Sequence, residues 1–210
     1  MNVLKLFYKA RRYAASYFTY DCASCGKTVR GSCLCKDCVS KMVPFENKIP
    51  GCAHAYYYAG PAKELMLRYK FGEDFDYCKD MLCLWLLDAF RNFKNEKIDF
   101  AVSVPAFSRK KTRLYYLAKE FCALADIPFA PSVLKKIRST EKQHSLPGKE
   151  RRHNLTDAFE ADFSVFGKTI LLIDDIYTTG STVFECSKAL YQKGAAKVLV
   201  LTMLKTDFPD

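Results

Sequence analysis

The chain has 210 residues, half of them hydrophobic, and a formal net charge of +10 at pH 7 with a pI near 9.1. This apolar content excludes a globally disordered chain, and no apolar run reaches the roughly 18 residues that a membrane span requires. The basic excess favours an acidic partner such as nucleic acid, a phosphorylated ligand or anionic lipid, although a Lys-rich cytosolic protein would carry the same charge.

We expect residues 1–20 to form an N-terminal helix, because apolar residues recur at roughly helical spacing from Val3 to Phe18 with basic residues on the other side. This helix would lie on an anionic surface or pack on the rest of the chain, and the pattern fits both. Lys5 and Lys9 interrupt its apolar residues, so we recognise no secretory signal. Because most of the ten cysteines also have apolar neighbours, we expect a cytoplasmic protein in a reducing compartment.

Residues 21–45 contain two Cys-x-x-Cys pairs and are expected to form a small zinc unit. The four predicted Zn²⁺ ligands are Cys22, Cys25, Cys35 and Cys38. Four thiolates would close the metal to substrate and make it structural. Cys33 is a fifth thiol that would replace Cys35 if the second pair were distorted. A redox Cys-x-x-Cys pair is the competing interpretation, but two pairs without a thioredoxin-like pattern favour zinc.

Strands and helices alternate through residues 50–210. We predict strands at residues 54–59, 98–105, 168–175 and 197–204. Helices are predicted at residues 62–71, 75–93, 113–126 and 182–195. The last two strands are continuously apolar, which is typical of a parallel sheet covered by helices on both faces, so the predicted fold class is α/β. The charged residues 136–155 are predicted to form a mobile loop or hairpin.

A dense group of polar residues follows the strand predicted at residues 168–175. Asp174 and Asp175 close this strand, and residues 178–182 then place four hydroxyl side chains around Gly180. Ligands of parallel sheets bind at the carboxyl ends of the strands, and the free N–H groups of a helix start favour phosphate. Carboxylates instead accept ribose hydroxyls, or hold Mg²⁺ beside them. The segment therefore predicts a site for a sugar 5-phosphate; the alternative is a helix cap beside a solvated strand end.

This segment, LLIDDIYTTGST at residues 171–182, resembles the phosphoribosyl-pyrophosphate (PRPP) motif of type I phosphoribosyltransferases. The resemblance implies that Asp174 and Asp175 contact the ribose hydroxyls and that Mg²⁺ accompanies PRPP. It implies a 5-phosphate site formed by Thr178, Thr179, Gly180, Ser181 and Thr182. The implied fold of residues 50–210 is a type I phosphoribosyltransferase-like parallel sheet flanked by helices, preceded by the small zinc ribbon or knuckle unit.

The order of motifs along residues 20–205 resembles the ComF family (ComF, ComFC and GntX-like), whose members carry an N-terminal zinc unit on a phosphoribosyltransferase-like domain. The most telling match is the charged loop, with the family's spacing at Arg138, Thr140, Gln143, Leu146, Arg151, Asn154, Ala158 and Phe159. The resemblance implies an accessory protein of natural transformation or DNA uptake that binds PRPP or a related phosphosugar, and single-stranded DNA. Implied partners are a DNA-uptake helicase or recombination proteins.

Two basic stretches, residues 108–113 and 134–153, flank the expected ligand mouth. They would neutralise pyrophosphate or follow the backbone of a DNA single strand, with nearby aromatic residues as stacking platforms. The candidate pyrophosphate or loop ligands are Arg109, Arg113, Arg138, Gln143 and Arg151.

Two other functions fit the same phosphate site. One is an active phosphoribosyltransferase that moves ribose 5-phosphate from PRPP to an unknown nitrogen acceptor, and the other is a PRPP-sensing regulator. We recognise no base-binding element, and the segment after Pro105 is shorter than in the ComF family, which speaks against efficient transfer. No catalytic residue is assigned.

Overall fold

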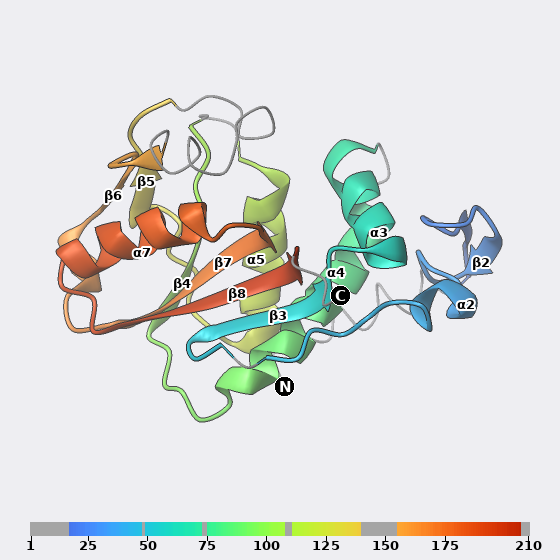
Figure 1. Ribbon diagram of the computed structural model, residues 1–210, viewed down its shortest axis with the longest axis horizontal. Helices are drawn as coiled ribbons and strands as arrows, with labels where there is room; N and C mark the ends of the chain where they lie inside the picture. The colour runs from blue at the N-terminus through green and yellow to red at the C-terminus, as the bar shows by residue number, and fades with distance from the viewer. Residues whose placement is uncertain (1–16, 48, 73–74, 108–110, 140–154, 207–210) are drawn as a thin grey trace.

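The computed structural model describes residues 17–47, 49–72, 75–107, 111–139 and 155–206, and a four-stranded sheet lies at its centre (Figure 1). The strands follow the order β3-β8-β7-β4, and every neighbouring pair is parallel. Their bounds are Cys52–Tyr57 for β3, Phe100–Ser103 for β4, Thr169–Tyr177 for β7 and Lys197–Lys205 for β8. The predicted α/β class is therefore confirmed.

Helices cover both faces of this sheet (Figure 1). One face carries α3 (Gly60–Phe71), α4 (Phe75–Phe90) and α5 (Arg113–Ala125), and the other carries α7 (Ser181–Gln192). Strand β7 contributes side chains to the hydrophobic cores on both faces of the sheet. Leu171 and Ile173 join the core beside α4 and α5, whereas Ile170 and Leu172 join the core beneath α7. All four side chains are fully buried, which explains why this strand is apolar without alternation.

The helices begin at recognisable start signals. Pro61 lies in the first turn of α3, and Thr112 caps α5 by accepting the N–H of Tyr115 at 3.2 Å. Helix α7 begins after Gly180, whose φ of +74° is left-handed and therefore suits glycine. The helix predicted at residues 75–93 ends at Phe90, and the 3₁₀ turn η1 (Arg91–Phe93) completes the segment.

Two short antiparallel pairs lie outside the main sheet. Strands β1 (Thr19–Asp21) and β2 (Thr28–Arg30) pair in the Cys-rich unit, and α2 (Lys36–Val39) follows them. Strands β5 (Leu134–Lys136) and β6 (Phe159–Ala161) pair beside α7, and the 3₁₀ turn η3 (Phe163–Val165) follows β6. Sequence patterns did not predict these strands because three residues are too few to show a period.

Two predicted segments lie largely outside the described residues. These are the N-terminal helix, of which only residues 17–20 are described, and the charged loop, of which residues 140–154 are not. Among the described parts of the chain, we find no helix with the length and apolar character needed to cross a membrane.

Candidate functional site

The predicted acidic pair lies at the carboxyl end of β7, and the strand continues through it to Tyr177. The Asp174 side chain is buried, and its Oδ1 accepts the N–H of Asp175 at 2.9 Å. Oδ1 of Asp175 in turn accepts the N–H of Ile176 at 2.7 Å. Burial, followed by the negative charge of Asp175, raises the pKa of Asp174 to about 8. Asp174 is therefore a carboxyl group that can exchange a proton near neutral pH.

This acidic pair lines a pocket of about 260 Å³, which we call the acidic pocket. Thr178 adds a hydroxyl group from the loop after β7 and Thr182 adds one from the first turn of α7. Lys70 and Lys136 add cations from α3 and β5. The remaining wall is apolar and consists of Val104, Pro105, Leu155, Phe159 and Ile176. Carboxylates, hydroxyls and ammonium groups thus share one small volume, which suits a ligand that carries both hydroxyl groups and a phosphate.

Lys70 is a site residue that the sequence analysis missed. Its Nζ lies 2.6 Å from Asp175 Oδ2, and the two side chains are 24% and 26% exposed. Lys70 lies in the last turn of α3, where basic residues are common because they favour the negative end of the helix dipole. Nothing in its local pattern therefore distinguishes it from Arg68 of the same turn, and only packing brings it to the acidic pair.

Lys136 is the second cation of the acidic pocket. The side chain is partly buried, and its Nζ lies 5.7 Å from the centre of the Phe159 ring on the paired strand β6. Burial lowers the pKa of Lys136, because a low-dielectric environment disfavours the ammonium form. The prediction placed Lys136 only within a long basic stretch; the structure places it at the pocket.

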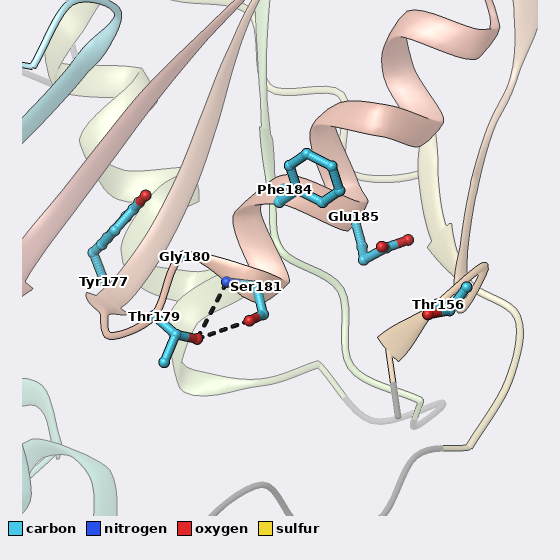
Figure 2. Close-up of a pocket in the computed structure, with 7 residues that line it drawn as sticks. All are labelled: Thr156, Tyr177, Thr179, Gly180, Ser181, Phe184 and Glu185. Atoms are coloured by element: carbon cyan, nitrogen blue, oxygen red, sulfur yellow. Dashed lines mark hydrogen bonds between the residues drawn. The ribbon is translucent and has the colours of Figure 1, made fainter. Parts of the chain in front are cut away.

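The residues that follow β7 are divided between the acidic pocket and a second pocket of about 370 Å³. Figure 2 shows the residues that line the second pocket. Thr178 and Thr182 line the acidic pocket, whereas Thr179, Gly180 and Ser181 line the second. The hydroxyls of Thr179 and Ser181 lie 2.8 Å apart and bond to each other. The five predicted phosphate ligands are therefore contiguous in space, but they form a wall between two pockets. Their assignment to phosphate remains a prediction.

Tyr177 holds this loop close to the sheet. Its ring packs edge-on against the buried His54 with 5.0 Å between ring centres, and a Cβ at Gly180 would collide with its hydroxyl. Nδ1 of His54, on β3, forms a hydrogen bond with Oγ1 of Thr202, on β8, at 2.7 Å, and this bond fixes the orientation of the imidazole. Gly180 is required here for two reasons, its left-handed φ and this close approach.

The predicted arginine ligands have different outcomes. The Arg113 guanidinium donates hydrogen bonds to the carbonyls of Tyr69 and Gly72, so it ties the start of α5 to the end of α3. Arg138 donates to the carbonyl of Thr156 at 2.7 Å. Neither lines the acidic pocket as described, and their role toward pyrophosphate stays a prediction. Three candidates lie outside the described residues: Arg109, Gln143 and Arg151.

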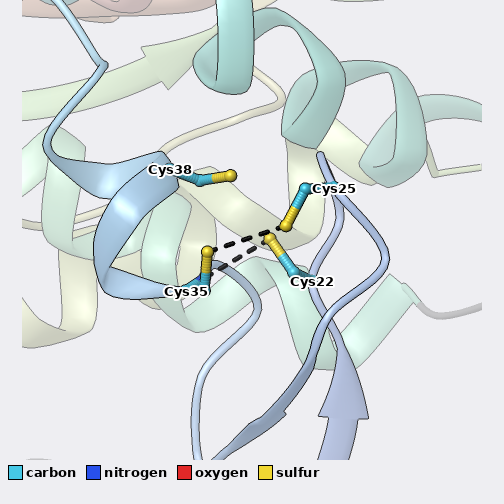
Figure 3. Close-up of side chains that lie close together, drawn as sticks. All are labelled: Cys22, Cys25, Cys35 and Cys38. Carbon is cyan, nitrogen blue, oxygen red and sulfur yellow. Dashed lines mark hydrogen bonds between the residues drawn. The ribbon is translucent and has the colours of Figure 1, made fainter.

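The four cysteines predicted to bind zinc converge on one point (Figure 3). The sulfur atoms of Cys22, Cys25, Cys35 and Cys38 all lie within 4.8 Å of one another, and those of Cys25 and Cys35 are 3.7 Å apart. A tetrahedral Zn²⁺ with Zn–S bonds of about 2.3 Å needs sulfurs about 3.8 Å apart, so the cluster fits this metal. The N–H of Cys35 also donates to Cys22 Sγ at 3.3 Å, a bond that would orient this ligand.

Cys33 does not belong to this cluster. Its side chain is buried, and its Sγ lies 3.7 Å from the sulfur of Met81 on α4. Cys35, rather than Cys33, is therefore the thiol that belongs to the cluster able to hold a metal, and Cys33 joins the Cys-rich unit to the core. All the cysteines described are free thiols, so no Cys-x-x-Cys pair in the described unit is a disulfide.

Comparison with known proteins gives relatives over most of the chain, although no family model matches. The DNA utilization protein YhgH of Escherichia coli (strain K12) is 29% identical over 194 residues, covering 88% of this chain and 84% of that protein. Competence protein F of Haemophilus influenzae is 26% identical over 200 residues, covering 85% and 87%. Competence protein ComFC of Bacillus subtilis is 26% identical over 210 residues, covering 96% and 85%.

Solved structures of PRPP-related enzymes resemble part of the chain. A phosphoribosylpyrophosphate synthetase from Mycobacterium smegmatis aligns with a TM-score of 0.39 and 21% identity, covering 61% of this chain and 34% of that chain. An adenine phosphoribosyltransferase aligns with a TM-score of 0.39 and 20% identity, covering 62% of this chain and 70% of that chain.

Proposed function

We propose that this chain, a homologue of the ComF-type competence and DNA-utilization proteins, binds a phosphosugar in the acidic pocket and single-stranded DNA beside it during DNA uptake or use. PRPP is the phosphosugar that we favour, because the PRPP-like segment supplies the acids and hydroxyls of the pocket. A DNA-uptake helicase or a recombination protein is the partner class that this role requires.

The main support for this proposal is that acidic side chains and phosphate-binding side chains line the same acidic pocket. Asp175 would accept a ribose hydroxyl as an ionised carboxylate, and Asp174 would accept one through its carbonyl oxygen while protonated or as a carboxylate above its pKa of about 8. Lys70, Lys136 and the hydroxyls of the loop would take the phosphate groups, since these oxygens need donors and positive charge. A ligand with only one of the two groups would leave half of the pocket without partners.

We assign Mg²⁺ to bound PRPP rather than to a separate site on the protein. Asp174 and Asp175 offer the oxygen ligands that Mg²⁺ prefers, but Lys70 Nζ already pairs with Asp175. Asp174 and Asp175 are the residues that would hold a cation carried by pyrophosphate, and Lys70 would then share Asp175 with it. When bound, Mg²⁺ would neutralise pyrophosphate charge.

Two observations support a role in DNA binding, the positive net charge of the chain and the names of its relatives. A net charge of +10 is more than one pyrophosphate needs, and relatives carry names that refer to DNA utilization and competence. Electrostatic binding to a DNA backbone would use this excess, with a strength that falls as salt rises.

The decisive experiment measures PRPP binding and pyrophosphate release side by side, with and without single-stranded DNA. The proposal expects PRPP binding by calorimetry, oligonucleotide binding, and no pyrophosphate release in the absence of an acceptor. Steady pyrophosphate release with a nitrogen acceptor would establish the transferase instead. PRPP binding with no affinity for DNA would favour the PRPP sensor, and no PRPP binding would overturn the phosphosugar assignment.

A further inference from the structure

An aromatic ring stands exposed at the second pocket, on the other side of the phosphate loop from the acidic pair. Phe184 lies in the first turn of α7 and is 66% exposed, yet it lines this pocket together with Thr179 and Ser181 (Figure 2). Its neighbours Val183 and Cys186 point into the core and are buried. Helix α7 therefore packs well without Phe184, and the ring contributes little to its anchoring.

A carboxylate lies in the same pocket. The Glu185 side chain is 11% exposed, and its Oε2 accepts the N–H of Asp157 at 3.2 Å. Lys188 Nζ lies 3.8 Å away and is shared with Asp157, at 2.9 Å. Glu185 accepts N–H donors and Phe184 offers an apolar surface, so a neutral group with N–H donors and an apolar face fits this side of the pocket. A nucleobase has both properties.

The two pockets share the loop of residues 178–182 as a common wall. Each phosphodiester of a DNA single strand joins two nucleosides, one on either side of the phosphate. A strand whose phosphate lies against Thr179, Gly180 and Ser181 would therefore place the next base toward Phe184 and leave the acidic pocket, on the other side of the loop, to the phosphosugar. The volume of about 370 Å³ is within the usual range for pockets that bind small ligands and is ample for one base.

We propose that the second pocket is a nucleobase subsite, in which a base of single-stranded DNA stacks on Phe184 while its phosphate lies at the loop of residues 178–182. This inference rests on the DNA-binding part of the proposed function and adds a specific residue to it. Stacking on an aromatic side chain tolerates any base, as a protein that handles strands of arbitrary sequence requires. Glu185 would accept an amino group of adenine, cytosine or guanine and so give these bases a modest preference over thymine, which has no amino group.

The test compares Phe184→Ala with Phe163→Ala, which removes a similarly exposed ring (74%) from η3, outside both pockets. Fluorescence anisotropy measures binding of a labelled oligonucleotide, and calorimetry measures ribose 5-phosphate, which has no base. Phe184→Ala should weaken oligonucleotide binding by about 5-fold to 100-fold, the range found for loss of one stacked base. Phe163→Ala should match the wild type, and Phe184→Trp should restore binding.

An abasic oligonucleotide of the same length makes the test specific for stacking. Wild-type protein should bind it less tightly than the normal strand, and this difference should be smaller for Phe184→Ala, because the two changes remove the same contact. Equal oligonucleotide affinities of wild type and Phe184→Ala would overturn the subsite while the DNA role stands. If Phe184→Ala lost as much affinity for ribose 5-phosphate as for the oligonucleotide, the subsite would also be overturned, since a distorted loop would then be the cause. No oligonucleotide binding by the wild type would overturn the DNA role and this subsite with it.

Discussion

Lys70 Nζ and Asp175 Oδ2 lie 2.6 Å apart and join the last turn of α3 to the carboxyl end of β7. This ion pair offsets part of the negative charge that two adjacent carboxylates place at the strand end. Arg113 holds the end of α3 in place through the carbonyls of Tyr69 and Gly72, so the position of Lys70 is fixed by a second contact. An anionic ligand can approach the acidic pair because this cation stands beside it.

We therefore expect Lys70→Met to weaken ribose 5-phosphate binding by about 5-fold to 10-fold, or roughly 1 kcal/mol, because Asp175 then repels the phosphate without compensation. The effect should shrink as salt is raised, since part of the pair is open to solvent. Calorimetry at two salt concentrations measures it. Lys63→Met, an exposed lysine of the same helix, is the matched control, and an equal effect of both substitutions would show that only net charge matters.

Replacing both acids, Asp174→Asn with Asp175→Asn, should weaken PRPP binding by about 2–4 kcal/mol while the fold stays intact, because the hydrogen bonds that the two acids accept from ribose hydroxyls, charge-assisted at Asp175, are lost. The variant should also lose its discrimination between ribose 5-phosphate and 2-deoxyribose 5-phosphate. Calorimetry with these ligands checks both effects, and Asp126→Asn at the end of α5 is the control. Unchanged PRPP affinity would remove the acids from the ribose site.

Asp174→Asn alone should stabilise the fold at high pH. The folded pKa of Asp174 is raised from 3.8 to about 8, so the folded state binds this proton more tightly than the unfolded chain does. The stability contributed by protonated Asp174 is therefore full below about pH 3.8 and is lost as pH rises through about 8. An always neutral Asn avoids this loss, so its advantage should grow by more than about 1 kcal/mol between pH 5 and pH 8.

Urea unfolding at both pH values measures this difference. Asp88→Asn, whose side chain is 63% exposed, should show the same free energy relative to wild type at each pH. A constant difference for Asp174→Asn across the same range would show that the carboxyl is ionised throughout.

The cysteine cluster should hold one Zn²⁺ per chain. Cys25→Ser should abolish zinc binding and unfold the unit around β1, β2 and α2 locally, whereas the parallel sheet, with its own core, should stay folded. Elemental analysis and circular dichroism with thermal melting measure these effects. Cys52→Ser, at a thiol outside the cluster, should keep the metal. Zinc-free protein with a native melting curve would disprove the assignment.

The basic residues of the charged loop should guide DNA. Replacing Lys142, Lys149, Arg151 and Arg152 with Ala should weaken oligonucleotide binding and flatten its salt dependence, because each lost phosphate contact lowers the slope of log K against log salt by roughly 0.7. A salt titration of anisotropy with wild-type and fourfold variant measures the two slopes. Identical slopes would exclude the loop from DNA binding and move the enzyme or sensor hypothesis ahead.

Local patterns in the sequence were sufficient to predict the parallel sheet, the acidic pair at the end of a strand and the cluster of four cysteines. Strand β7 must be apolar on both faces because helices cover both faces of the sheet. The four consecutive apolar residues 170–173, all buried, meet this requirement and are visible in the sequence. The cysteine cluster is also local in origin, since two short turns bring each pair of thiols together. Such features depend on residues close in the chain, so spacing alone reveals them.

Only the tertiary structure decided which distant side chains complete the site. Lys70 and Lys136 come from α3 and β5, and their ordinary positions in basic segments carry no signal until packing places them at β7. The same holds for Arg113, which packing directs to the end of α3, and for Phe184, whose exposure depends on the way α7 lies on the sheet. Strand β7 continues to Tyr177, and the ring of Tyr177 lies against the turn at Gly180. The residues 178–182 that follow therefore lie between the two pockets. Contacts between segments far apart in sequence depend on the shape and charge of the folded surfaces. The periodicity of the sequence carries no information about them.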